Sequence, residues 1–272
     1  MSKYFKFVFL FIFSTSFAWS QDALKTDAQK LWQKRDEKES LAQAIQKFEQ
    51  LHKANPSDQE ILLSLIRSNF IMGDFHTTDK DEKLKILEKA FHYGDQALAL
   101  NSEYSQRLKK GDDIEEAVKA LTLKEVPLMF WTAASIGKYA RTKGLFASIK
   151  FKGKILALIS RVEQLEPTYF YGAVNRYWGG YFGVIPGIAG KDLKKSKQNF
   201  EKSLKLAPEY LGTKVLMAET YYVEKDDEKD FKKILNEVVQ DTKAENHPEL
   251  GPENRLEKIK AKKLLENVDE YF

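Results

Sequence analysis

The stretch LKKSKQNFEKSLKLAPEYL, residues 193–211, decides the fold of this chain. It has a small residue at Ser196, an aromatic residue at Phe200, a second small residue at Ser203 and a proline at Pro208. Small side chains let two helices approach closely, and an aromatic ring fills the groove between them. Proline then ends the helix. The stretch therefore predicts one member of a closely packed helix pair.

The same spacing recurs along the chain. The clearest copy lies near the N-terminus, at Ala44, Phe48, Leu51 and Pro56. Two weaker copies lie between, at Ala90, Gly94, Ala97 and Ser102 and at Ile155, Ile159, Val162 and Pro167. This order of residues is typical of the tetratricopeptide (TPR) repeat, which is two antiparallel helices in about 34 residues. We therefore predict an all-α, TPR-like α-solenoid of antiparallel helix pairs.

The segments around the last copy are predicted to complete the solenoid. The glycine-rich segment 185–192 predicts a turn, with Asp192 near the start of the next helix, where a carboxylate is favourable. A final helix pair is predicted over about 211–240, and 252–271 is predicted to be a C-terminal capping helix. Pro252 suits the first turn of that helix.

The N-terminal residues do not read as part of this fold. Two lysines precede a seven-residue apolar run, 7–13, and small residues suit cleavage by signal peptidase before Gln21, with Trp19 as the alternative. The run is too short to span a bilayer, although an uncleaved anchor is a second interpretation. We predict a signal peptide over 1–20 and a helical domain over 21–272.

Composition and motifs argue against catalysis. The chain has no cysteine, which excludes disulfides and a lipidated cysteine. Its four histidines lack metal-ligand spacing, and no nucleophile or zinc-protease motif occurs. We expect a binding protein without cofactor or metal, and not an enzyme. The alternative, an enzyme acting on a polymer, would use Glu163 and Glu166 as paired carboxylates.

Positive charge is concentrated in one segment. Residues 126–162 contain no acidic residue, although the whole chain has a net charge of only +4. The basic residues there are Lys138, Arg141, Lys143, Lys150, Lys152, Lys154 and Arg161. The segment indicates either a solvated helix face or a surface for an anionic partner, ligand or membrane, whereas nucleic acid is not expected. Lys150, Lys152 and Lys154 are the candidate residues for docking a partner.

Aromatic residues are concentrated in the next segment. Residues 169–182 alternate aromatic residues with glycines, and each glycine destabilises a helix by about 1 kcal/mol relative to alanine. A backbone or a ligand is therefore expected to approach closely. The segment is either an ordinary aromatic core or a binding cleft. Trp178, Tyr181 and Phe182 are predicted to be the apolar walls of the cleft, and Arg176 is the anchor for an anionic head group. Trp131 and Tyr177 are further candidate ligand-binding residues.

The order of motifs over 167–219 resembles one known family. It runs from Pro167-Thr168-Tyr169 through Asn175-Arg176-Tyr177-Trp178-Gly179, Gly190-Lys191-Asp192-Leu193 and Leu206-Ala207-Pro208-Glu209-Tyr210 to Ala218-Glu219. It resembles the T component (TatT) of TPR-associated TRAP transporters. The resemblance implies a periplasmic helical protein that partners the solute-binding protein of the transporter. It also implies a homotrimer with a cleft or pore for a hydrophobic or organic-acid ligand. The alternative function is a TPR adaptor in envelope assembly that binds peptide segments of other proteins.

Overall fold

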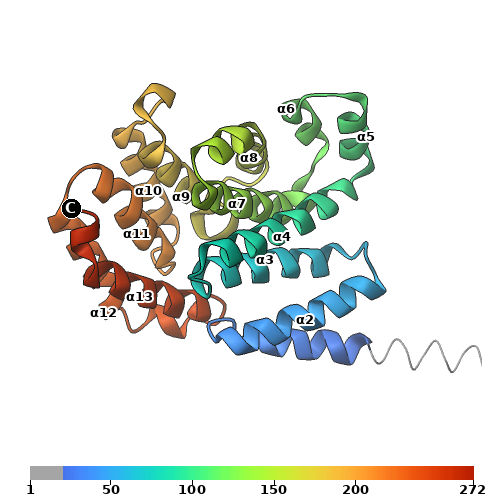
Figure 1. Cartoon of the computed structure of the whole chain (residues 1–272), viewed down its shortest axis with the longest axis horizontal. Helices are drawn as coiled ribbons and strands as arrows, with labels where there is room; N and C mark the ends of the chain where they lie inside the picture. Colours follow the sequence, from blue (N-terminus) through green and yellow to red (C-terminus); the bar gives the residue numbers. More distant parts are fainter. Residues whose placement is uncertain (1–20) are drawn as a thin grey trace, which may run out of the picture.

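The computed structural model describes residues 21–272, so the predicted signal peptide lies outside the described residues. Within 21–272 the chain forms helices and no β-strand. Neighbouring helices pack in pairs, among them α3 with α4, α7 with α8, α9 with α10 and α12 with α13 (Figure 1). The predicted all-α fold of adjacent helix pairs is confirmed.

The helix boundaries agree with the predicted terminators. A first helix covers residues 21–32. The helices that follow are α2 (Lys38–Ala54), α3 (Gln59–Phe75), α4 (Lys80–Ala99), α5 (Ser102–Lys110), α6 (Ile114–Ala117), α7 (Val126–Lys143), α8 (Leu145–Leu165), α9 (Tyr169–Val184), α10 (Leu193–Leu206), α11 (Gly212–Met217), α12 (Glu228–Gln240) and α13 (Gly251–Glu266). Pro56, Pro167 and Pro208 each lie two residues beyond the end of a helix, namely α2, α8 and α10. Proline therefore terminates helices at the predicted places.

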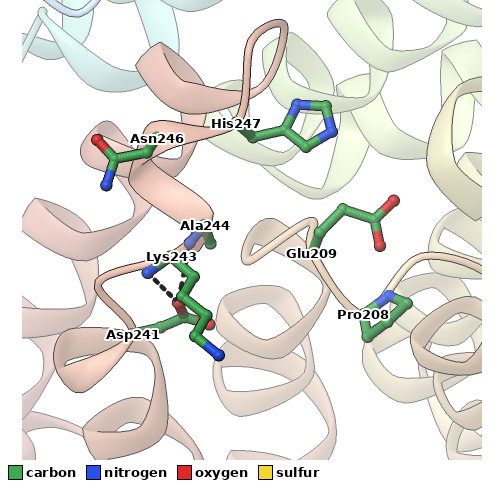
Figure 2. Close-up of a pocket in the computed structure, with 7 residues that line it drawn as sticks. All are labelled: Pro208, Glu209, Asp241, Lys243, Ala244, Asn246 and His247. Carbon is green, nitrogen blue, oxygen red and sulfur yellow. Dashed lines mark hydrogen bonds between the residues drawn. The ribbon is translucent and has the colours of Figure 1, made fainter.

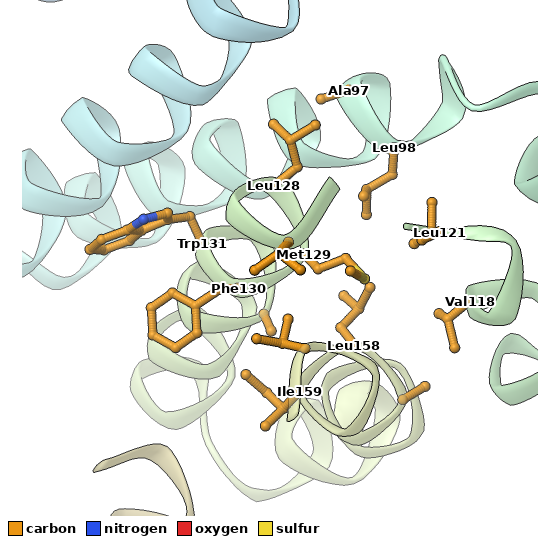
Figure 3. Packing of buried hydrophobic residues seen from close by; sticks show 14 of the residues in the cluster. Ala97, Leu98, Val118, Leu121, Leu128, Met129, Phe130, Trp131, Leu158 and Ile159 are labelled. Carbon is orange, nitrogen blue, oxygen red and sulfur yellow. The ribbon is translucent and has the colours of Figure 1, made fainter. Parts of the chain in front are cut away.

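The largest apolar core lies between α4, α7 and α8. Figure 3 shows Ala97 and Leu98 of α4, Met129 of α7 and Leu158 and Ile159 of α8 converging there. In the same view Trp131 of α7 points away from the centre of this core. The face of α7 that carries Trp131 is thereby turned toward a different part of the molecule.

The C-terminal helices form a second core, which includes Phe200 of α10, Val215 of α11 and Phe231 of α12. Asp192 caps α10 as predicted, because its side chain accepts a hydrogen bond from the Lys195 backbone N–H at 2.9 Å. Pro252 lies in the first turn of α13, also as predicted. A π-helical turn, Ala218–Tyr222, continues α11 toward α12.

Helix α13 returns to the helices at the start of the chain (Figure 1). Leu256 packs with Leu41 of α2 and Ile71 of α3. Arg255 forms two hydrogen bonds with the Asp36 carboxylate, at 2.6 and 2.9 Å. The helix predicted as a terminal cap therefore closes the chain on itself, and it creates a junction between the first and last helices.

Candidate functional site

A cation surrounded by aromatic rings lies at this junction. The guanidinium of Arg67, on α3, lies 5.0 Å from the ring centre of Trp32, 5.1 Å from Trp131 and 5.2 Å from Phe170. These rings come from the first helix, α7 and the start of α9. We call Arg67 and the three rings the aromatic cage. Attraction between a cation and the faces of aromatic rings holds such an arrangement together.

Sequence reasoning did not select Arg67, although a signal was present. Arg67 is the single charged residue between Glu60 and Asp74, in a run that is otherwise rich in leucine and isoleucine. Burying a charge in an apolar helix is unfavourable unless the charge has a partner. An isolated arginine in such a run therefore marks a position that the tertiary structure uses.

Positive charge exceeds negative charge at the cage. Arg35 forms a buried ion pair with Glu253 of α13, and Arg67 approaches the same carboxylate at 3.4 Å. Two guanidiniums thus share one carboxylate. Among residues 21–272, the Nε of Arg67 finds no hydrogen-bond partner. Burial lowers the pKa of Arg67, with Arg35 lowering it further and Glu253 opposing. The Arg67 side chain keeps 23% of its surface exposed, although its Nε is buried.

The backbone beside the cage is strained. Phe170, Tyr171 and Gly172 have φ of 42°, 56° and 68°, in the left-handed region that large side chains rarely adopt. Three contacts hold the turn: the Tyr171 hydroxyl donates to Glu249 Oε2 at 2.6 Å, Arg176 donates to the Tyr171 carbonyl at 3.0 Å and Ser203 donates to the Gly172 carbonyl at 3.0 Å. The turn directs the Phe170 ring onto Trp131 and Arg67. Strain of this kind concentrates at functional sites.

Two of the predicted ligand-binding residues lie at this junction. Trp131 forms a wall of the cage and is 4% exposed. Arg176 lies behind the strained turn, where its guanidinium is 4.2 Å from the Tyr210 ring centre and is 7% exposed. Burial lowers the pKa of Arg176, while Glu257 opposes this. The contacts of Arg176 described above are internal, and they orient the turn that presents Phe170.

The other predicted residues, Tyr177, Trp178, Tyr181 and Phe182, lie on the opposite face of α9. Successive helical residues are rotated by about 100°, which separates these four from Arg176. Trp178 stacks with Phe182 and donates from Nε1 to Glu163 Oε2 at 3.0 Å. All four are half-buried. The structure therefore does not bring them together with Trp131 and Arg176.

The glycines of α9 have a packing explanation. A Cβ added to Gly179 would lie 2.8 Å from the Phe200 ring of α10. One added to Gly183 would lie 3.1 Å from the Thr220 carbonyl. The sequence analysis expected either a backbone or a ligand to approach these glycines closely. At Gly179 and Gly183 the close approach of a neighbouring helix explains the absence of a side chain.

The three candidate docking lysines are not equivalent. Lys154 forms an ion pair with Asp95 of α4 at 2.5 Å. Lys150 and Lys152 are exposed on α8. Their role in docking a partner stays a prediction.

A second group of charges lies deeper, between α3, α7, the π-helical turn and α13. It contains ion pairs between Lys138 and Asp74 at 2.8 Å and between Lys260 and Glu219 at 2.7 Å. Glu257 lies nearby and is 7% exposed. We call these five residues the inner charge network. They link the N-terminal helices to the C-terminal ones.

A hollow of about 330 Å³ opens on the surface between the loop that follows α10 and the segment that follows α12 (Figure 2). Its lining includes Glu209, Asp241, Lys243 and His247. Asp241 already accepts hydrogen bonds from the backbone N–H groups of Lys243 and Ala244, both at 2.9 Å. Within residues 21–272 no cluster of His, Asp and Glu is arranged to hold a metal ion.

Residues 37–272 match the profile of the family described as TRAP transporter T-component. The chain belongs to this family. Of the cage residues, Arg67, Trp131 and Phe170 lie within the match. Comparison with curated proteins found no significant match.

The resemblance seen over 167–219 is thus confirmed and extended to most of the chain. Membership in this family indicates that the chain is associated with a TRAP transporter. The family is a transport component and is not known as a family of enzymes. Among the described residues, no helix is long and apolar enough to cross a bilayer.

Proposed function

We propose that this T-component works in the periplasm, where it docks the solute-binding subunit of a TRAP transporter and holds a carboxylate ligand with an apolar body. The observation that carries the ligand part is Arg67, a partly exposed cation among three aromatic rings with an unused donor. Family membership supports the association with the transporter. A homotrimer is part of the same proposal.

The charge of the cage selects an anion. Arg67 and Arg35 share one carboxylate, so a ligand carboxylate would supply a second. The planar guanidinium matches a carboxylate in geometry, and charge-assisted hydrogen bonds are about twice as strong as neutral ones.

The rings select an apolar body beside that anion. Trp32 and Phe170 are half-buried, and they leave apolar surface next to the guanidinium. Ligand sites in proteins typically combine apolar walls with a few placed polar groups. A medium-chain fatty acid or an aromatic acid fits this combination, whereas a highly charged metabolite does not.

Titration with octanoate and with 1-octanol tests the ligand part, because the two share an eight-carbon chain and differ in charge. Calorimetry should show binding of octanoate and at least tenfold weaker binding of octanol. The Arg67→Met variant should lose octanoate affinity by roughly tenfold or more, since a hydrogen bond to a charged group contributes about 1.5–3 kcal/mol. Its fold should persist, because the ion pair between Arg35 and Glu253 remains.

Arg107→Met is the matched control. Arg107 is a partly exposed arginine of α5 that pairs with Glu103 at 2.7 Å, away from the cage. It should bind octanoate as the wild type does. Equal octanoate affinity in the Arg67 variant and the wild type would refute the assignment of Arg67. Affinity purification from the native host tests the transporter part separately, and absence of a solute-binding subunit from the eluate would contradict it.

A further inference from the structure

The turn between α7 and α8 presents large apolar side chains to solvent. Gly144, with φ of 119°, ends α7, and α8 begins at the next residue. The exposed fractions are 63% for Leu145, 89% for Phe146 and 64% for Ile149. We call these three residues the apolar tip. They lie at i, i+1 and i+4, so they share one face of the first turns of α8.

The rest of α8 shows that this exposure is specific to the tip. Further along the helix, Ile155, Leu158, Ile159 and Val162 are buried in the core. Single exposed apolar residues are ordinary on protein surfaces, but adjacent ones on one face indicate an interaction site.

Exposed basic residues flank the apolar tip. Lys143 precedes it, and Lys150 and Lys152 follow it. Two acids from other helices contact α8 farther along the helix. Asp95 is paired with Lys154, and Glu115 approaches Gly153, eight residues beyond Leu145. At 1.5 Å per residue, Gly153 lies roughly 12 Å along the helix from Leu145 and roughly 6 Å from Ile149.

We propose that the α7–α8 turn is a peripheral membrane-binding element for an anionic bilayer. Apolar side chains next to lysines are typical of surfaces that insert into the boundary between headgroups and acyl chains. Phe146, Leu145 and Ile149 enter that boundary, and Lys143 and Lys150 lie at the level of the lipid phosphates. Long lysine side chains can place their alkyl stems in apolar surroundings while the ammonium contacts phosphate.

Charge and shape favour a bilayer over a protein partner. The Phe146 ring is 89% exposed, so a protein would need a matching apolar pocket for it, whereas a bilayer accepts such a ring without one. A symmetric contact with a second copy would bring lysines against lysines. Anionic lipid attracts each lysine with about 1 kcal/mol near the surface. The proposal is independent of the aromatic cage and of its ligand.

Co-sedimentation with vesicles tests the proposal. The full sequence is expressed, and every variant is purified in the same processed form, so that the N-terminal segment is common to all. Wild-type protein should bind vesicles of phosphatidylglycerol and phosphatidylcholine and should bind pure phosphatidylcholine weakly. The triple variant Leu145→Ser, Phe146→Ser, Ile149→Ser should lose at least tenfold in binding to the anionic vesicles. Lys143→Gln and Lys150→Gln should each lose roughly fivefold, and added salt should reduce wild-type binding.

The control variant is Leu123→Ser, which removes a 60% exposed apolar side chain near the other end of α7. It should bind anionic vesicles as the wild type does. Circular dichroism checks that all variants are folded. Absence of wild-type binding, or unchanged binding by the triple variant, overturns the proposal. Loss of a solute-binding subunit from pull-downs of the triple variant, with vesicle binding intact, assigns the tip to that protein. Dissociation of an oligomer by the triple variant, again with vesicle binding intact, assigns it to a second copy.

Discussion

At the scale of single residues, Glu257 of the inner charge network carries a pH dependence. Burial raises its pKa to about 7 from 4.5, with Glu219 and Asp74 raising it further and Lys260 and Lys138 opposing. In the described chain its Oε2 is buried without a hydrogen-bond partner. Between about pH 4.5 and 7 the folded protein keeps a proton that the unfolded chain releases. This carboxyl therefore makes the folded state less stable as the pH rises through that window.

We predict that Glu257→Gln stabilises the protein at pH 8, by of order 1 to 3 kcal/mol, because one pKa unit corresponds to about 1.4 kcal/mol. At pH 4 the variant and the wild type should have nearly equal stability, since the carboxyl is then neutral in both states. Urea denaturation at the two pH values measures the difference. Glu266→Gln, an exposed carboxyl of the same helix, is the control. A difference that does not depend on pH would contradict this account of Glu257.

At the scale of helices, the approach of α4 to α7 depends on Gly94. A Cβ added there would lie 2.1 Å from Thr132 Oγ1 and 2.8 Å from Thr132 Cβ. Thr132 is held by a hydrogen bond to the Leu128 carbonyl at 2.6 Å. The added methyl group therefore forces the helices apart.

We predict that Gly94→Ala lowers the free energy of unfolding by about 1–3 kcal/mol, the usual effect of overpacking a core. Gly137→Ala is the matched control within α7, because no atom of the described chain beyond its neighbours and its own helix backbone lies within 4 Å of the added Cβ. That change should stabilise the protein by about 0.5–1 kcal/mol, since alanine favours a helix more than glycine does. Thermal and urea denaturation measure both. Equal effects of the two substitutions would show that packing at Gly94 is unimportant.

At the scale of the whole molecule, Glu253 joins the last helix to the first ones. Its carboxylate is 4% exposed and receives both Arg35 and Arg67. Removal of one partner from a buried ion pair leaves an uncompensated charge, which is strongly destabilising.

We predict that Glu253→Gln lowers the free energy of unfolding by about 3–5 kcal/mol. It should also raise hydrogen exchange in α13 and in residues 21–36 more than in α12. Exchange measured by mass spectrometry locates the effect. Glu266→Gln should leave both regions unchanged. Protection lost evenly over all helices would show that Glu253 does not act specifically on the closure of the chain.

Much of the fold was predictable because it depends on short-range chemistry. Helix ends at Ala54, Leu165 and Leu206 follow from prolines two residues later, and the start of α10 follows from Asp192. The resemblance to the T-component family rested on the motifs over 167–219, and the family match over 37–272 confirmed it. These features depend on residues within a few positions of one another.

The candidate site depended on tertiary structure instead. The sequence by itself determined an all-α chain of helix pairs, and it marked Trp131 as a candidate. Only the folded chain decided that α13 returns to the first helices, and that Arg67 lies among rings separated from it by tens of residues or more. The physical reason is that contacts between distant segments depend on how helix pairs rotate and close, whereas a one-dimensional pattern records only which face of each helix is apolar.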